Sequence, residues 1–195
     1  MKYMSNRTEQ LAHKLYENHI ISEAEIPVYQ YCLDYIRDNL VFFLFICIYA
    51  SVWRRCYAGL LMWGCLFFLR KFCGGIHAST RRLCNFISYG IIIFAIPSTY
   101  IFDFIRTYIW IIIYIIASGI LLYLLPVDTP HKRLTKETRT RMRFYGMGTY
   151  VIITILWLFF LYQHEILYYG MITVCVMIVT TSMLLGEYQN RKEQP

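Results

Sequence analysis

The sequence predicts an all-α, polytopic integral membrane protein, in which a bundle of about six transmembrane helices follows an amphipathic N-terminal helix. Hydrophobic residues make up 58% of the 195-residue chain, and only 16% of the residues are charged. Soluble domains usually carry about 25% charged residues. The apolar residues also form long runs separated by basic segments, which is typical of a chain that crosses a bilayer.

The N-terminal segment, residues 3–20, intersperses apolar residues such as Leu11 and Leu15 with charged residues such as Lys14. This pattern favours a short amphipathic helix, which either lies on the membrane surface or packs as a solvated helix on the bundle. No cleavable signal peptide is expected, because residues 1–26 contain no apolar core segment.

Six stretches approach the length of about 20 mostly apolar residues that a transmembrane helix needs. The first is apolar only in its second half and the second is short, so four full spans with a shallow hairpin are an alternative. The expected spans are about 34–53, 56–69, 83–102, 107–125, 145–162 and 166–185. We expect one membrane domain over 1–195, with a juxtamembrane segment at 1–33, the bundle at 34–185 and a cytoplasmic tail at 186–195.

The distribution of Lys and Arg predicts the orientation of these spans. Segment 70–82 holds four basic residues and no acid, and segment 126–143 holds six basic residues against two acids. Both segments and both termini should therefore face the cytoplasm. The same rule explains the net charge of +7 without a nucleic-acid partner. Arg54 and Arg55 are exceptions to the positive-inside pattern, because six spans place them on the side opposite the cytoplasm.

The sequence gives little indication of a metal site or of disulfide bonds. The seven cysteines are odd in number and form no CxxC pair, so neither a disulfide framework nor a zinc site is expected. His164-Glu165 begins an HExxH motif, but Tyr168 occupies its last position. No metal or cofactor is expected.

The segment 70–84 contains a glycine pair, a histidine and a cysteine, which are the parts of a Cys-His hydrolase site. The imidazole of His77 could take the proton of Cys84, whose thiolate is the nucleophile. On one continuous helix the two residues would lie about 10.5 Å apart along the axis, so His77 must lie outside the helix that carries Cys84. A solvated histidine and a packing cysteine are the alternative.

The glycine pair offers a route to this geometry. Gly74 and Gly75 permit a sharp turn, and Ser79 or Thr80 could cap a following helix with Cys84 about one turn inside it. The positive end of that helix would favour the thiolate. Cys73 is a second nearby thiol, but no helix terminus is clearly aimed at it.

The basic residues before Gly-Gly-x-His, the cysteine seven residues later and the Pro-Val-Asp-Thr-Pro-His-Lys run at 126–132 resemble the accessory gene regulator B (AgrB) family of Gram-positive bacteria. The resemblance covers nearly the whole chain. It implies a multi-pass cysteine endopeptidase of the bacterial plasma membrane, with its active site facing the cytoplasm. Such an enzyme would cleave an AgrD-like quorum-sensing propeptide through a thioester and release a thiolactone or lactone ring.

The same resemblance assigns roles to individual residues. His77 would be the general base and Cys84 the nucleophile, while Arg70 and Gly75 would position them. Asp128 would orient His77, bind substrate or only form a turn between prolines, and Lys132 belongs to a basic loop that would attract an acidic peptide tail. The expected partners are the propeptide, the lipid bilayer and a second copy in a homodimer.

Two other classes of protein compete with this interpretation. A non-catalytic exporter or chaperone of a small peptide would not need Cys84. A lipid-modifying enzyme would need a carboxylate cluster, whereas Asp103, Asp128 and Glu165 are isolated in the sequence.

Overall fold

The computed structural model of this protein describes residues 6–75, 81–127 and 135–192, with the backbone alone at residues 6, 7, 81, 82 and 84. Within these ranges 89% of the residues are helical and no strand forms. In chain order the elements are α1 (Asn6–Glu17), the 3-10 helix η1 (Glu23–Glu25), α2 (Ile26–Val52), α3 (Cys56–Cys73), α4 (Arg81–Ser98), the 3-10 helix η2 (Thr99–Phe104), α5 (Thr107–Leu124), α6 (Lys136–Tyr162) and α7 (Ile166–Lys192). The chain forms two compact units, Met1–Phe45 and Ile46–Pro195.

Six of these helical segments are long and apolar enough to cross a bilayer, which confirms the predicted polytopic all-α class. The predicted ends need correction, because hydropathy marks only the apolar part of a helix. Backbone hydrogen bonding carries the helices further into polar sequence. Thus α2 begins at Ile26 rather than near 34, and α6 begins at Lys136 rather than near 145. Likewise α3 continues to Cys73, and α7 continues to Lys192.

In the first unit, α1 is joined to the start of α2 by a buried polar contact. The hydroxyl of Thr8 donates to a carboxylate oxygen of Asp34 at 2.9 Å, and the Arg37 guanidinium lies 3.1 Å from the same oxygen. A buried carboxylate in an apolar chain needs such partners. The apolar side chain of Leu11 on α1 stays exposed, and so does that of Ile20 in the turn that follows.

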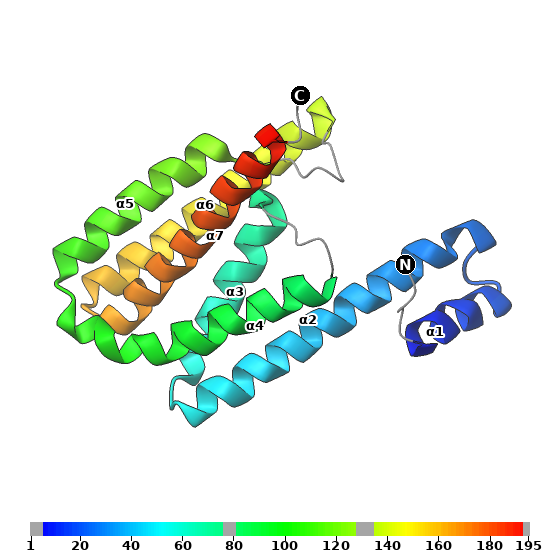
Figure 1. Cartoon of the computed structure of the whole chain (residues 1–195), viewed down its shortest axis with the longest axis horizontal. Helices are drawn as coiled ribbons and strands as arrows, with labels where there is room; N and C mark the ends of the chain where they lie inside the picture. The colour runs from blue at the N-terminus through cyan, green and yellow to red at the C-terminus, as the bar shows by residue number, and fades with distance from the viewer. Residues whose placement is uncertain (1–5, 76–80, 128–134, 193–195) are drawn as a thin grey trace. The chain divides into compact units, whose positions relative to one another are not determined.

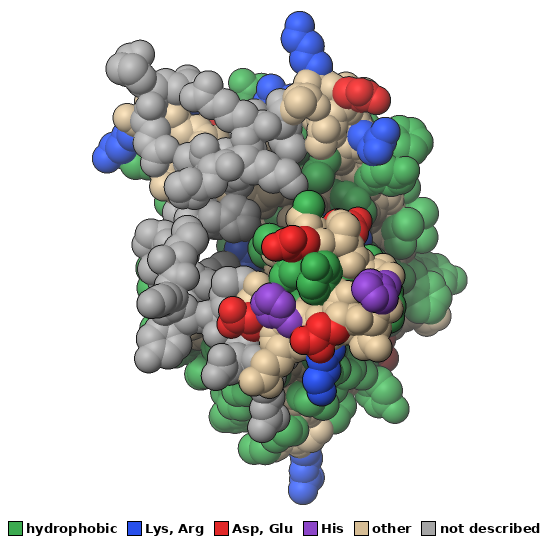
Figure 2. Space-filling view, turned by 90° about the vertical axis from the view of Figure 1, so that its right-hand side faces the viewer, with side chains coloured by type: hydrophobic (Ala, Val, Ile, Leu, Met, Phe, Trp, Pro, Cys, Tyr) green, Lys and Arg blue, Asp and Glu red, His purple; other side chains and the backbone are tan. Residues whose placement is uncertain are grey.

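Charged side chains gather at the turn that links α1 to η1. Glu17, His19, Glu23 and Glu25 are all exposed there. Figure 2 shows acidic and histidine side chains close together on this face, around a hydrophobic side chain.

The second unit is organised around α7, which packs against α3, α5 and α6. Figure 1 shows α5, α6 and α7 running side by side. The central part of α7 contributes fully buried residues such as Met171, Ile172 and Val176. At Gly170 an added Cβ would lie 2.7 Å from the Phe102 ring, so the missing side chain admits η2 against α7.

Polar side chains inside the second unit are paired across helices. The Trp157 indole donates to the Thr173 hydroxyl at 3.0 Å, and the Tyr114 ring stacks on Trp157 with 4.1 Å between ring centres. The Thr180 hydroxyl donates to the carbonyl of Ala117 at 3.1 Å. In hydrocarbon these groups have no water to bond, so such pairs fix which helix faces meet.

Arg54 and Arg55, which disagreed with the charge rule, form the tight turn between α2 and α3. Arg54 has a positive φ of 54°, and the backbone N–H of Arg55 donates to the carbonyl of Ala50 at 2.8 Å. The Arg55 guanidinium lies 4.6 Å from the centre of the Tyr100 ring. This cation–π contact gives the charge a local partner at the end of the bundle opposite Gly74 and Gly75.

Close contact between the end of α2 and α3 predicts that Gly59→Ala destabilises the protein. An added Cβ would lie 2.6 Å from the Ala50 Cβ and 3.3 Å from an Ile46 methyl group. Overpacking of this kind costs about 1–3 kcal/mol, so the melting temperature in detergent should fall. Gly64→Ala on the same helix meets nothing within 4 Å and should not lower it. Equal melting temperatures for the two variants would contradict this contact.

Candidate functional site

The candidate site lies where α3 ends, at two glycines that both have positive φ. Gly74 has a φ of 74°, and Gly75 has a φ of 130°. An L-residue rarely adopts such angles, so glycine is needed at both positions for the chain to turn here. Because the backbone departs from helical angles at this point, α3 does not run on into α4 as one helix.

Gly74 is held against the segment that follows α5. The N–H of Val127 donates to the Cys73 carbonyl at 3.0 Å, and Gly74 and Val127 form an isolated parallel bridge. A Cβ on Gly74 would collide with the Val127 carbonyl oxygen. Leu125 in turn packs over Gly146 of α6, where an added Cβ would lie 2.9 Å from a Leu125 methyl group.

Gly75 is held against α7 in the same way. A Cβ added to Gly75 would lie 2.6 Å from the Ser182 hydroxyl oxygen and 3.3 Å from the Ser182 backbone. Position 75 therefore requires glycine for two reasons: its positive φ, and the lack of space for a Cβ beside Ser182. We call Cys73, Gly74, Gly75, Val127 and Ser182 the glycine junction. It joins the end of α3 to the segment that follows α5 and to the second half of α7.

The structure describes three of the six predicted site residues. Arg70 lies in the last turn of α3 with its side chain partly buried, and Gly75 belongs to the glycine junction. Cys84 is the fourth residue of α4, counted from Arg81, which agrees with the expected position about one turn into that helix. His77, Asp128 and Lys132 lie outside the described residues, so the meeting of His77 with Cys84 stays a prediction.

Cys73, the second thiol of the segment, is fully buried and is therefore poorly placed to act as a nucleophile. Its exposed fraction is 0%, and its carbonyl accepts the Val127 N–H inside the glycine junction. A buried thiol packs as a small apolar group. Among the two cysteines near the glycine pair, Cys84 is therefore the better candidate.

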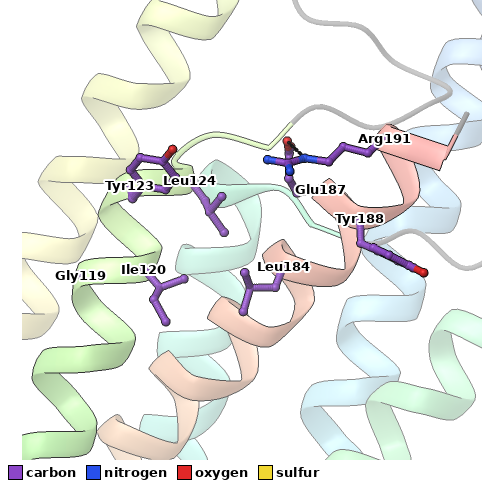
Figure 3. A pocket seen from close by; sticks show the side chains of 8 residues that line it. All are labelled: Gly119, Ile120, Tyr123, Leu124, Leu184, Glu187, Tyr188 and Arg191. Atoms are coloured by element: carbon purple, nitrogen blue, oxygen red, sulfur yellow. Dashed lines mark hydrogen bonds and ion pairs between the residues drawn. The ribbon is translucent and has the colours of Figure 1, made fainter. Parts of the chain in front are cut away.

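A groove opens between the C-terminal parts of α5 and α7, with a volume of about 420 Å³. In Figure 3 the side chains of Ile120 and Leu184 line it, and the ion pair of Glu187 and Arg191 lies toward the end of α7, at 3.3 Å. Among the described residues that line this groove there is no cysteine, serine or histidine. Its described lining can bind an apolar group and offers no nucleophile.

Metal ligation has no support in the described ranges, where no group of three or more His, Cys, Asp and Glu side chains could hold an ion. Sequence reasoning did not find Val127 and Ser182. Ser182 lies within an apolar helix and carries no motif signal, and Val127 belongs to the run at 126–132 but has no chemistry of its own that would mark it. Only the packing of segments far apart in the chain brings them to the glycine pair.

These features define a class of polytopic membrane protein. Its third and seventh helices and the segment after its fifth helix meet at a glycine turn, and the next helix in the chain carries a cysteine near its start. Within that class, the chain belongs to the accessory gene regulator B family, whose model matches residues 8–183. No curated protein and no solved structure matches the chain. The family assigns this membrane protein to the processing of agr quorum-sensing peptides.

Proposed function

We propose that this protein is a cysteine endopeptidase of the bacterial plasma membrane that cleaves an AgrD-like propeptide on the cytoplasmic side. The observation that supports the proposal is the position of Cys84 as the fourth residue of α4 (Arg81–Ser98), the helix that follows the glycine junction in the chain. The positive end of the helix dipole stabilises an anion in the first turn. Cys84 therefore lies where a thiolate is favoured.

The proposed general base is His77, which follows Gly75 by two residues. Cys84 transfers its proton to the imidazole as its sulfur attacks the carbonyl carbon of the scissile peptide bond. The new C–S bond forms, the C–N bond breaks, and the imidazolium returns the proton to the leaving amine. The C-terminal fragment departs, and the remaining peptide is bound to Cys84 as a thioester.

The thioester then has two fates. Attack by a cysteine or serine of the same peptide gives a thiolactone or lactone, whereas attack by water gives a linear product. Ring closure by a thiol exchanges one thioester for another and is intramolecular, so proximity lowers its barrier by several kcal/mol. Formation of a thioester from an amide is unfavourable, and removal of the fragment or product must draw the reaction forward.

Basic residues around the glycine junction suit an acidic propeptide tail. Arg70 and Lys71 end α3, and the segment 126–143 carries six basic residues against two acids. These charges would raise the local concentration of an acidic peptide at the membrane surface, with an effect that weakens as salt rises. We propose that Arg70 and Lys132 take part in this attraction, and that Asp128 orients His77 or binds substrate.

Mass spectrometry of the covalent intermediate tests the proposal. Protein in liposomes, incubated with the propeptide and quenched in acid, should carry the N-terminal peptide fragment on the tryptic peptide that contains Cys84. Hydroxylamine should remove the added mass, because it cleaves thioesters. Cys84→Ser should carry no adduct that hydroxylamine removes, because any acyl group on the serine would be an ester, which resists mild hydroxylamine. An adduct on Cys73, or cleavage without any adduct in wild-type protein, would contradict the mechanism.

A further inference from the structure

The groove between α5 and α7 lies on a different side of α7 from the glycine junction. Four residues of α7 line it, at intervals of three and four positions that place them on one helix face: Leu184, Glu187, Tyr188 and Arg191. Ser182 precedes Leu184 by two positions, which is about 200° around a helix of 3.6 residues per turn. The groove is therefore separate from the candidate peptidase site.

The inner part of the groove is apolar and suits a single hydrocarbon chain. Figure 3 shows Ile120 of α5 and Leu184 of α7 facing each other. A Cβ added to Gly119 would meet nothing within 4 Å, so the groove stays open on the α5 side. Its volume of about 420 Å³ is only that of about one turn of a peptide helix, roughly 400–600 Å³ for a cylinder about 10–12 Å wide. Since both helices are candidate membrane spans, the chain available to fill the groove is a lipid acyl chain.

The outer part of the groove has the residues of a membrane–water interface. Tyr123 and Tyr188 line it and are both exposed. Tyrosine is enriched where the hydrocarbon core meets the headgroups. Arg191 follows Leu184 by seven residues, about 10.5 Å along the helix, and the headgroup layer of one leaflet is roughly 5–8 Å thick. A lipid whose chain lies beside Leu184 would therefore have its headgroup near the Arg191 guanidinium.

The charges at this end favour an anionic headgroup. The Nε of Arg191 donates to the Glu187 carboxylate at 3.3 Å, while the guanidinium is exposed and carries further N–H donors. Lys192 adds a second cation, with its Nζ 4.8 Å from the centre of the Tyr188 ring. The two cations outnumber the carboxylate, and a guanidinium binds phosphate oxygens in a bidentate manner.

We propose that this groove binds an anionic phospholipid, with one acyl chain between α5 and α7 and the phosphate at Arg191. The site goes beyond the proposed peptidase activity and does not depend on it, since its lining shares no residue with the glycine junction and does not include Cys84. A lipid bound there would contact both helices, and a ligand that binds only the folded protein stabilises it.

Thermal melting in dodecyl maltoside tests the site. Dioleoyl-phosphatidylglycerol and dioleoyl-phosphatidylcholine carry the same acyl chains and differ in headgroup charge, and each is added in increasing amounts. Phosphatidylglycerol should raise the melting temperature of the wild type by at least about 3 °C, and phosphatidylcholine should raise it less. Glycerol phosphate, which has no acyl chain, should leave it unchanged.

Three substitutions in the groove should change the response to phosphatidylglycerol. Arg191→Gln removes the cation and should raise the lipid concentration for a half-maximal shift about tenfold. Gly119→Leu extends into the open groove and should weaken the response to a similar extent. Glu187→Gln removes the competing carboxylate and should strengthen it.

Two matched variants control for charge and for added bulk. Arg141 forms an ion pair of the same spacing with Glu137 on α6, at 3.9 Å, so Arg141→Gln removes the same charge outside the groove. Gly148→Leu adds the same side chain at another exposed glycine where a Cβ would meet nothing within 4 Å. Both variants should keep the wild-type response.

Each other result would overturn part of the proposal. Equal shifts with the two lipids in the wild type would rule out selection of an anionic headgroup. A phosphatidylglycerol response that survives in both Arg191→Gln and Gly119→Leu would rule out this groove as the site. If Gly119→Leu keeps the lipid response and raises KM for the propeptide, the groove binds peptide instead. None of these readouts of lipid binding requires Cys84 to be catalytic, so failure of the peptidase proposal would leave them unaffected.

Discussion

Cys84→Ala is expected to reduce propeptide cleavage by about 10⁴-fold or more, because loss of the nucleophile removes the covalent route altogether. His77→Ala should cost about 10²–10⁴-fold, the usual contribution of a general base. The measurement is the initial rate of fragment release from propeptide by protein in liposomes. Both variants keep the residues of the glycine junction, so both should fold.

Cys73→Ala is the matched control for this prediction. It removes a thiol eleven positions earlier in the chain whose exposed fraction is 0%. A small change in thermal stability is expected from the lost sulfur, with the cleavage rate retained. Retained peptide maturation in Cys84→Ala would instead favour the non-catalytic exporter or chaperone, which has no use for a nucleophile.

Gly75→Ala should produce the second largest effect, a loss of both cleavage and thermal stability. The substitution forces an L-residue to a φ of 130° and places a Cβ 2.6 Å from the Ser182 hydroxyl oxygen. Backbone strain alone costs about 1–3 kcal/mol, and the steric contact adds to it. Cleavage should fall sharply, because the displaced turn leads directly into the segment with His77.

Two further variants separate the effect of backbone strain at Gly75 from the effect of the steric contact with Ser182. Gly119→Ala meets nothing within 4 Å and should leave both properties unchanged. Combining Gly75→Ala with Ser182→Gly removes the contact with the hydroxyl but keeps the positive φ. The melting temperature of the double variant should therefore recover only in part. Full recovery would show that backbone strain at Gly75 is unimportant, and a Gly75→Ala protein with wild-type stability would contradict the glycine junction itself.

Helix ends and individual charges show where sequence reasoning succeeded and where it did not. Apolar composition located the middle of every span, since the preference for lipid is a property of each segment alone. It placed the start of the first span near 34, whereas α2 begins at Ile26, and it did not show that Asp34 is buried beside Thr8 and Arg37. It also left Arg55 unexplained, because the compensating ring of Tyr100 lies 45 positions later.

The candidate site likewise has features that the sequence indicates and features that only the structure shows. The motif from Arg70 to Cys84 could be recognised in the sequence because its residues are close together in the chain and their chemistry is specific. The sequence also indicated that the glycine pair must turn the chain. It could not indicate what the glycines touch, since Val127 and Ser182 follow Gly74 and Gly75 by 53 and 107 positions.

The sequence by itself therefore determined that the chain is a membrane bundle and which segments are apolar enough to cross, and it predicted which short motif carries the reactive groups. These are local properties, set by the solvation of each segment and by covalent neighbours. Only the tertiary structure decided that α3, α5 and α7 meet at the glycine junction, that Cys73 is sealed inside it, and that a buried hydroxyl faces the turn. Those contacts arise from shape complementarity between helices far apart in the chain, and no single segment encodes them.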